Sequence, residues 1–282
     1  MKRRNFTGAT LLSLVGAGSA TAAPGLRIGL TAVILADQAA FLARWSDYLS
    51  KRVGEPIQFV VRESYQVILD LLFVGQIDAA WICGYPYVRN HTRLRILAVP
   101  LYQGQPLYQA YLIRQAGSAP EINGWSDLKG RVLAYSDPLS NSGWLVAQHQ
   151  MQLAGLAPSD LRRTFFARSH SNVAEAVAAG LAHAGSIDGY VWETMKLQNA
   201  AATAATEVIW KSDRYGFPPL VARHVDTSSA VEQLARALIG MRDMLNALPL
   251  LNALNLDGFV AADPALFDSV RALAAAVERP RA

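Results

Sequence analysis

The sequence has 282 residues and a single cysteine, Cys83, so no disulfide can form within the chain. Charged residues make up only 17% and hydrophobic residues 52%, a balance that excludes a largely disordered chain and allows a sizeable core. The formal net charge is +4, and Lys2, Arg3 and Arg4 supply three of those charges. Without them, 23 basic residues face 22 acidic ones, so we expect no nucleic-acid partner.

Signatures of common enzymes are also missing. The sequence contains no Gly-x-Ser-x-Gly elbow, no Walker loop and no His-Glu-x-x-His motif. The five histidines stand at positions 91, 149, 170, 183 and 224, which is not metal-ligand spacing. We therefore expect a protein that is not an enzyme and holds no cofactor or metal.

The first 23 residues have the pattern of a signal peptide. A basic Lys2-Arg3-Arg4 start precedes a short apolar run at 9–17 and an A-x-A site at Ala20–Ala22. We expect cleavage near Ala22/Ala23 and release into the periplasm, because no cysteine follows that could carry a lipid anchor. Arg3-Arg4-Asn5-Phe6 also resembles a twin-arginine signal, so Sec and twin-arginine export both stay open.

Beyond residue 23, short apolar runs alternate with helical patterns, which predicts an α/β fold with doubly wound parallel sheets. Strands are expected at 26–30, 57–61, 79–82, 94–99, 107–114, 131–135, 164–167, 184–187, 207–210 and 220–223. Helices are expected at 41–53, 65–74, 144–154, 172–179 and from about 228 onward.

An internal repeat divides this pattern into two parts. Residues 64–87 align without gaps on residues 169–192, at an offset of 105. Polar, Gly- and Pro-containing stretches at 115–124 and 211–219 separate the parts. We expect a first lobe at 24–114 completed by 213–282, a second lobe at 115–212, and a two-strand hinge between them.

Polar residues at three expected helix starts form the candidate ligand site. Ser140, Asn141 and Ser142 follow a strand and precede a helix, where unpaired N–H groups and the helix dipole favour an anion; a plain helix cap is the alternative. The repeat adds two further starts, Ser64-Tyr65 and Ser169-His170. Tyr65 can donate a hydrogen bond to an oxyanion, and His170 can do so as a cation.

Other candidates lie at the ends of the equivalent strands. Asp188 could accept a hydrogen from a protonated ligand oxygen or pair with a ligand amine; a turn residue before Gly189 is the alternative. Trp81, Tyr85 and Tyr87 could wall a pocket, although core packing is favoured for Trp81.

In this order and spacing, these segments resemble the phosphate-, phosphite- and phosphonate-type substrate-binding proteins of ABC transporters. The segments that carry the resemblance over residues 26–245 are Ser64-Tyr65, 75–81, 84–88, Asp137-Pro138 with 140–143, and Ser169-His170 with Ile187-Asp188. The resemblance implies a type II periplasmic-binding-protein fold with oxyanion contacts from Tyr65, residues 140–142 and His170. It also implies that Tyr108 and either Asp188 or Tyr190 complete the pocket.

The sequence departs from the family pattern at three positions. Asn141 stands where phosphonate binders often have threonine, Ala110 where many have serine, and Tyr190 where an acidic residue could hold a ligand amine. These departures favour a bare or simple oxyanion over an amino-phosphonate.

We therefore expect a monomeric solute-binding protein that presents a small oxyanion to an ABC transporter permease. Three rivals stay open: a sensor partner that presents ligand to a membrane kinase, a ferric-ion binder using Tyr85, Tyr87 and Tyr190, and an enzyme on the same fold.

Overall fold

The computed structural model describes residues 25–31, 38–117, 121–198 and 200–279. The expected signal peptide and its cleavage site lie outside these residues. Within them, no helix combines the length and the apolar character needed to cross a bilayer.

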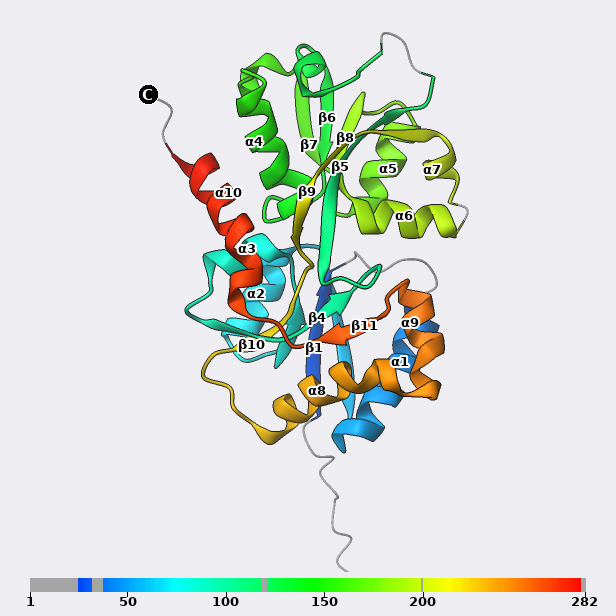
Figure 1. The fold of residues 1–282 in the computed structure, drawn as a ribbon, viewed down its shortest axis with the longest axis vertical. Helices are drawn as coiled ribbons and strands as arrows, with labels where there is room; N and C mark the ends of the chain where they lie inside the picture. Colours follow the sequence, from blue (N-terminus) through cyan, green and yellow to red (C-terminus); the bar gives the residue numbers. More distant parts are fainter. Residues whose placement is uncertain (1–24, 32–37, 118–120, 199, 280–282) are drawn as a thin grey trace, which may run out of the picture.

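The described chain forms two mixed sheets, stacked end to end along the long axis of the molecule (Figure 1). The six-stranded sheet has the order β11-β4-β10-β3-β1-β2: β11 (Gly258–Val260), β4 (Leu94–Leu101), β10 (Leu220–Arg223), β3 (Ala79–Trp81), β1 (Leu26–Thr31) and β2 (Ile57–Arg62). The five-stranded sheet has the order β7-β6-β8-β5-β9: β7 (Arg163–Phe166), β6 (Val132–Tyr135), β8 (Ala184–Asp188), β5 (Leu107–Gln115) and β9 (Thr206–Gly216).

Helices cover both sheets (Figure 1). Around the six-stranded sheet lie α1 (Gln38–Val53), α2 (Tyr65–Phe73), α3 (Gly84–Arg89), α8 (Ser229–Ile239) and α9 (Leu248–Leu254). Around the five-stranded sheet lie α4 (Val146–Leu153), α5 (His170–Ala178), α6 (Gly189–Leu197) and α7 (Ala201–Ala204). The last helix, α10 (Asp268–Glu278), packs on both α3 and α4 and so joins the two halves. Short 3₁₀ or π turns are η1 (Trp125–Leu128), η2 (Asn141–Leu145), η3 (Pro158–Asp160), η4 (Gly240–Asp243), η5 (Leu245–Ala247) and η6 (Pro264–Phe267).

The sheets are mixed, whereas the sequence pattern predicts parallel ones. The pairs β1–β2, β1–β3, β6–β7 and β6–β8 are parallel, but β5, β10 and β11 pair antiparallel with their neighbours. Two of these antiparallel strands, β5 and β10, enter from the other sheet, so no crossover helix turns them into the parallel direction.

The chain crosses between the sheets at 102–106 and 217–219, because β5 and β9 both belong wholly to the five-stranded sheet. The lobe boundaries expected from the sequence, after residues 114 and 212, do not coincide with these crossings. The polar stretch at 115–124 follows the end of β5 that is farther from its crossing, so it is not a connection between the sheets. The crossing at 217–219 is the buried segment Phe217-Pro218-Pro219, which lies at the end of the Gly- and Pro-containing stretch at 211–219 that the sequence marks as a separator.

The repeat found in the sequence has the same local structure in both copies. Ser64 and Ser169 cap α2 and α5, and their hydroxyls accept hydrogen bonds from the N–H groups of Val67 and Asn172 at 3.3 and 3.1 Å. The strands β3 and β8 follow, and the next helices begin at equivalent glycines. The two copies lie in different sheets, so each sheet presents the same kind of helix start.

Structure extends the repeat further than the sequence does. Asp78 and His183 occupy the same repeat position, and each accepts a backbone N–H: Asp78 from Arg27 at 2.8 Å and His183 Nδ1 from Val132 at 3.0 Å. Arg27 and Val132 are themselves 105 residues apart, so β1 and β6 belong to the repeat. Aspartate and histidine are different residues, but the carboxylate and the neutral imidazole both supply the hydrogen-bond acceptor that this position needs.

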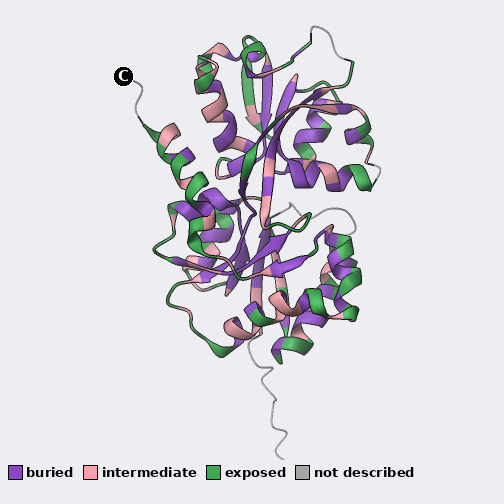
Figure 2. Cartoon of the chain, in the orientation of Figure 1, coloured by how far each residue is buried: buried purple, intermediate pink, exposed green. Residues whose placement is uncertain are grey.

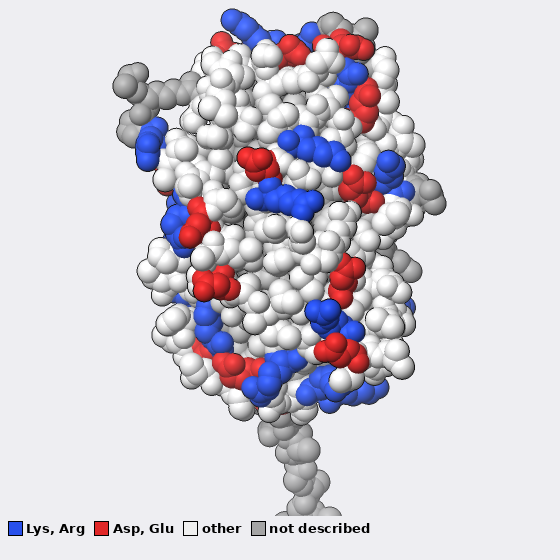
Figure 3. All heavy atoms as spheres, in the orientation of Figure 1, with Lys and Arg blue, Asp and Glu red and all other residues white. Residues whose placement is uncertain are grey.

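Apolar side chains fill both halves, and buried residues line the interior of each (Figure 2). In the six-stranded half, Trp45 is fully buried and lies against Phe59, Trp81 and Phe259, with ring centroids 4.9–6.4 Å apart. On the face in Figure 3, basic and acidic side chains are interspersed. One buried apolar cluster extends from the six-stranded half into the five-stranded half, and a second, smaller cluster lies within the five-stranded half around Leu112, Trp125 and Tyr135.

Gly180 tests the repeat geometry, because it ends the second repeat helix at φ +72°, where an L side chain is strained. Nothing closer than 3.9 Å would meet a Cβ there, so the cost comes from the backbone alone. We expect Gly180→Ala to lower the free energy of unfolding by about 1–2 kcal/mol, measured by urea denaturation. Gly240→Ala is the control: its φ is −73° and its surroundings are open, so it should be neutral or stabilising.

Candidate functional site

The candidate site lies where strand ends and helix starts from both sheets meet. Three pairs of side chains, each 105 residues apart, stand at equivalent places: Thr31 and Ser136 at the ends of β1 and β6, Tyr65 and His170 at the starts of α2 and α5, and Cys83 and Asp188 before α3 and α6. The repeat therefore places like positions face to face across one cleft, where open α/β sheets bind ligands.

The loop before η2 is shaped by its own hydrogen bonds. Ser140 Oγ accepts the N–H of Gly143 at 2.9 Å, and the Ser140 carbonyl accepts from Trp144 and Leu145. A Cβ on Gly143 would lie 1.9 Å from Ser136 Oγ, so only glycine allows this close approach. The loop is thus held tightly against the end of β6, and the acceptor role of Ser140 is that of a helix cap.

Three buried polar atoms of this loop have no hydrogen-bond partner among the described residues: Ser136 Oγ, Asn141 Oδ1 and Ser142 Oγ. Burial raises the pKa of the Tyr108 phenol well above its usual value, and the nearby Ser142 hydroxyl opposes that rise without completing a hydrogen bond. Buried polar groups in folded proteins are almost always paired. Three such groups in one loop therefore mark a place for a polar ligand.

His170 is neutral. Burial lowers the pKa of its imidazole to about 3, and Nδ1 accepts the N–H of Asp188 at 3.0 Å. The ring proton therefore sits on Nε2, which can donate one hydrogen bond. The expectation that His170 acts as a cation is thus wrong, because its site is almost dry, with 2% of the residue exposed.

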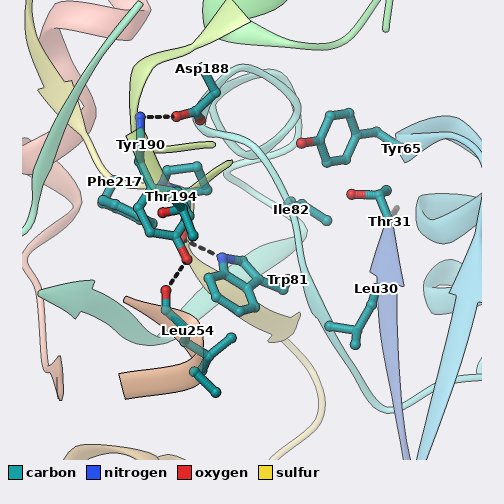
Figure 4. Close-up of a pocket in the computed structure, with 12 residues that line it drawn as sticks. Leu30, Thr31, Tyr65, Trp81, Ile82, Asp188, Tyr190, Thr194, Phe217 and Leu254 are labelled. Atoms are coloured by element: carbon teal, nitrogen blue, oxygen red, sulfur yellow. Dashed lines mark hydrogen bonds between the residues drawn. The ribbon is translucent and has the colours of Figure 1, made fainter. Parts of the chain in front are cut away.

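The pKa of Asp188 is shifted in the opposite direction to that of His170. Burial raises the pKa of its carboxyl to about 7, although Oδ1 accepts the N–H groups of Tyr190 and Val191 at 2.9 and 3.4 Å. These bonds cap α6 and fix the carboxyl at the cleft edge (Figure 4). At neutral pH the group is close to half protonated, so it can donate or accept a hydrogen.

Tyr65 stands between two carboxyls. Its N–H donates to Asp137 Oδ2 at 3.3 Å, and Thr31 lines the same two cavities beside it. Burial raises the pKa of the phenol well above its usual value, and the proximity of Cys83, Asp137 and Asp188 raises it further. Tyr65 is therefore a neutral donor whose hydroxyl points into the cavity (Figure 4).

Cys83, Asn141 and Tyr108 form a chain across the two sheets. The N–H of Asn141 donates to Cys83 Sγ at 3.2 Å, and Asn141 Nδ2 donates to the Tyr108 hydroxyl at 3.0 Å. Burial raises the pKa of the Cys83 thiol, so sulfur stays protonated and unreactive here. The buried Cys83 sulfur is thus a structural hydrogen-bond acceptor.

Three further predicted site residues, Tyr85, Tyr190 and Ser64, offer no free hydrogen-bond donor to the cleft. Tyr85 donates to Glu278 at 3.0 Å and stacks on Trp144, away from both cavities described below. The hydroxyl of Tyr190 donates to the Leu254 carbonyl, so its ring is a wall. Ser64 Oγ is occupied by its helix cap.

Two cavities meet at Thr31 and Tyr65. The larger is lined by Leu30, Thr31, Tyr65, Trp81, Ile82, Asp188, Tyr190, Thr194, Phe217, Pro218, Ala253 and Leu254. The smaller is lined by Thr31, Glu63, Tyr65, Ser136, Asp137, Arg168, Ser169 and His170. Ser140, Asn141, Ser142 and Tyr108 lie deeper, fully or almost fully buried.

Sequence reasoning missed Thr31, Ser136 and Phe217, and favoured a core role for Trp81. Thr31 and Ser136 could have been found by extending the 105-residue offset to the strands before the repeat. No comparable signal marks Phe217, because it reaches the cleft only through the crossing at 217–219.

The described residues contain no group of three or more His, Cys, Asp or Glu side chains able to hold a metal ion. The three tyrosines of the ferric-ion hypothesis also have separate partners. Tyr85 bonds Glu278, Tyr87 packs on Phe267, and Tyr190 bonds the Leu254 carbonyl. They do not form one ligand set.

A family model described as ABC transporter, phosphonate, periplasmic substrate-binding protein matches residues 30–267. The chain belongs to this family. A curated relative is the phosphate-import protein PhnD of Mycolicibacterium smegmatis, 28% identical over 178 residues, which are 58% of this chain and 55% of that protein. The chain thus matches only about half the length of that relative.

Solved structures share the fold. A binding-protein component of an ABC phosphonate transporter from Pseudomonas aeruginosa aligns with a TM-score of 0.80 and 21% identity, covering 88% of this chain and 85% of that one. PhnD1 from Prochlorococcus marinus in complex with methylphosphonate aligns with a TM-score of 0.77 and 17% identity, covering 89% and 97%. These matches confirm the periplasmic-binding-protein architecture with two α/β halves.

The opposite pKa shifts of His170 and Asp188 predict opposite pH dependences of stability. The folded state holds a proton on Asp188 that the unfolded chain releases above pH 4, so this contribution is lost as pH rises to about 7. The unfolded chain binds a proton on His170 below pH 6.5 that the folded state excludes, so that contribution is lost as pH falls towards 3. In the parent protein the two trends oppose each other.

Single substitutions should separate the two pH dependences of stability. Between pH 4 and 6.5, Asp188→Asn should make the free energy of unfolding rise more steeply with pH than in the parent. His170→Gln should make it fall, each slope changing by up to about 1.4 kcal/mol per pH unit. Urea denaturation at several pH values measures both slopes. Slopes that shift in the same direction would contradict these protonation states.

Proposed function

We propose that this chain is the solute-binding component of an ABC importer, located in the periplasm, and that it captures phosphate, phosphite or a phosphonate between its two sheets. The observation that carries the proposal is the unpaired set Ser136 Oγ, Asn141 Oδ1 and Ser142 Oγ, buried in a loop that opens a helix. The membership of the family of phosphonate substrate-binding proteins supports the same assignment.

The donors around this loop fit an oxyanion. Ser136 and Ser142 offer hydroxyls, Tyr65 a phenol, and His170 an Nε2–H, all of them neutral. The starts of α2 and α5 add the partial positive charge of helix N-termini. Neutral donors in a dry site bind an anion through hydrogen bonds of about 1.5–3 kcal/mol each.

Asp188 gives the site a preference for ligands that share a proton. With a pKa near 7, its carboxyl can donate to a phosphoryl oxygen or accept from a protonated one. Asn141 Oδ1 is a second acceptor. A phosphorus oxyanion that still carries one proton satisfies both donors and acceptors, whereas sulfate offers acceptors alone at this pH.

Catalysis is not part of the proposal. The Cys83 thiol is protonated and bound to a backbone N–H, and Arg168, the cation lining the smaller cavity, pairs with Glu63 at the rim. The protonated Cys83 thiol and the Arg168 cation are therefore not activated nucleophiles.

We further propose that the two sheets are the cores of two lobes that open about the crossings at 102–106 and 217–219. On this division, the first lobe is 25–101 with 220–279, and the second is 107–216. The bonds Asp137–Tyr65 and Asn141–Cys83 join the lobes and would break on opening. A permease would then recognise the closed form, in which these contacts exist.

Substitutions in the donor set test the site. Ser142→Ala and Tyr65→Phe should each weaken binding of phosphate or methylphosphonate by about ten- to a hundredfold, because each removes one hydrogen bond to a charged ligand. His170→Ala should weaken it at least as much, since Asp188 loses its anchor as well. Isothermal titration calorimetry measures the affinities.

Ser228→Ala is the matched control. Its hydroxyl caps α8 through Val231, as Ser64 caps α2, but it lies outside both cavities. This variant should lose about 1 kcal/mol of stability and keep full affinity. If the three site variants bind as tightly as Ser228→Ala does, the proposed site is wrong.

A further inference from the structure

The C-terminal helix α10 reaches from one half of the molecule to the other. It belongs to the first of the two lobes described above, where it packs on α3, and it also packs on η2 and α4 of the second lobe (Figure 1). The two crossings at 102–106 and 217–219 lie elsewhere in the chain. The helix α10 is therefore a third connection between the lobes, and it is made by packing rather than by the backbone.

The start of α10 is held tightly against the first lobe and the end of β9. Phe267, the residue before the helix, is fully buried, and its ring centroid lies 4.9 Å from that of Tyr87 on α3. A Cβ on Gly84 of α3 would lie 3.2 Å from the Phe267 ring. A Cβ on Gly216, the last residue of β9, would lie 2.9 Å from the Leu266 carbonyl oxygen. This close packing leaves the start of the helix no room to shift.

One face of α10 carries an apolar stripe. Val270, Leu273 and Ala274 are buried and Val277 is half-buried, at the i, i+3, i+4 and i+7 spacing of one side of a helix. Ala272, on the opposite side, is exposed. Because the helix packs on elements of both lobes, the stripe is covered by the two lobes together. Moving the second lobe away would expose part of this apolar surface to water, which is unfavourable.

Tyr85 joins the far end of α10 to the second lobe. Its ring stacks on Trp144 of η2, with centroids 6.0 Å apart and planes 24° apart, and its hydroxyl donates to Glu278 at 3.0 Å. Tyr85 belongs to the first lobe, Trp144 to the second, and Glu278 is the last residue of α10. Tyr85 is buried, so its ring is fixed in this position. We call these three side chains, Tyr85, Trp144 and Glu278, the clasp.

The clasp is connected to the loop that carries the unpaired polar groups. Trp144 lies in the same short turn, η2, as Asn141 and Ser142. Tyr85 follows two residues after Cys83, whose sulfur accepts the N–H of Asn141 at 3.2 Å. Separating Trp144 from Tyr85 would therefore also draw this loop away from the first lobe and open the cleft.

Resting on the lobe division of the proposed function, we propose that α10 is an arm of the first lobe that holds the second lobe closed before a ligand binds, so that the clasp gates ligand entry. Opening about the crossings breaks the stack of Tyr85 on Trp144 and uncovers the apolar stripe. A ligand enters or leaves only while the clasp is open, so both rates depend on how often it opens. The clasp is present in the ligand-free and in the ligand-bound closed form, so it changes these rates more than the affinity.

The one cysteine of the sequence reports lobe opening without any ligand. Cys83 is 1% exposed, and the Asn141 amide of the second lobe bonds its sulfur. Alkylation of the intact protein by iodoacetamide, followed by mass spectrometry, therefore proceeds through the open form at a rate set by its population. Tyr85→Phe and Glu278→Ala each remove the same hydrogen bond and should each speed alkylation about three- to tenfold. The double variant should react no faster than the quicker single variant, because only one bond is lost.

Tyr111→Phe is the matched control. Tyr111 is buried like Tyr85, and its hydroxyl donates to Glu193 at 3.2 Å, but both of these residues belong to the second lobe. This variant should lose about as much stability to urea as Tyr85→Phe does and should keep the parental rate of alkylation. The comparison separates opening of the lobes from unfolding of the whole protein, because unfolding would expose Cys83 in both variants.

Ligand kinetics extend the test to the gate itself. Stopped-flow tryptophan fluorescence with phosphate and methylphosphonate measures association and dissociation. In Tyr85→Phe both rates should rise by the same factor as alkylation, while the dissociation constant changes less than about twofold. A dissociation constant that weakens about tenfold at an unchanged association rate would place Tyr85 in the ligand site and overturn the gate.

The outcomes keep the clasp and the proposed function apart. Parental alkylation rates in both clasp variants overturn the arm, and so does an equal acceleration by Tyr111→Phe. A parent thiol that reacts as fast as in the urea-unfolded chain overturns it as well, because the lobes are then not held closed. If the clasp variants react faster but calorimetry detects no binding of either compound, the proposed oxyanion ligand fails and the role of the arm in lobe closure stands.

Discussion

The hydrogen bond from the Asp188 amide to His170 Nδ1 determines much of the chemistry of the cleft. It joins the end of β8 to the start of α5 and fixes the imidazole as a neutral ring with its proton on Nε2. A cationic histidine could not accept that bond. Because the same residue carries a carboxyl with a pKa near 7, the two neighbours exchange their usual roles: the base is held neutral and the acid is partly protonated.

The 105-residue repeat explains why these groups meet. Each half of the molecule carries a strand, a serine-capped helix, a glycine at positive φ and a second strand in the same order. Two such units facing each other present two helix starts and two strand ends to one space. The differences between equivalent positions then create the site: Tyr65 faces His170, and the Cys83 thiol faces the Asp188 carboxyl. One side supplies a phenol and the other an imidazole to the same place.

Local sequence signals predicted much of this. Ser64, Tyr65, His170 and Asp188 were identifiable because capping, turns and the repeat depend on neighbouring residues. The serines of the 140–142 run were identifiable for the same reason, although the structure separates their roles into a cap at Ser140 and an unpaired hydroxyl at Ser142.

Other features depend on contacts between residues far apart in the chain, so the sequence could not reveal them. Tyr85 turns away from the cleft because its hydroxyl donates a hydrogen bond to Glu278. That residue lies on α10, 193 positions further along the chain. The protonation state of His170 follows from burial, which no local pattern reports. Among the residues that line the larger cavity, Trp81, Phe217 and Leu254 come from β3, the crossing at 217–219 and α9, three segments without a common motif. The crossing at 102–106 was missed because a short turn between two apolar strands resembles an ordinary hairpin.

A crystal structure of the protein with methylphosphonate tests the central claim most directly. The account predicts the phosphoryl group between the two sheets, with its oxygens within hydrogen-bond distance of Ser142 Oγ, the Tyr65 hydroxyl and His170 Nε2. A phosphoryl group bound at the rim on Arg168, or with its methyl group directed at Ser142 and its oxygens at Trp81, would contradict it.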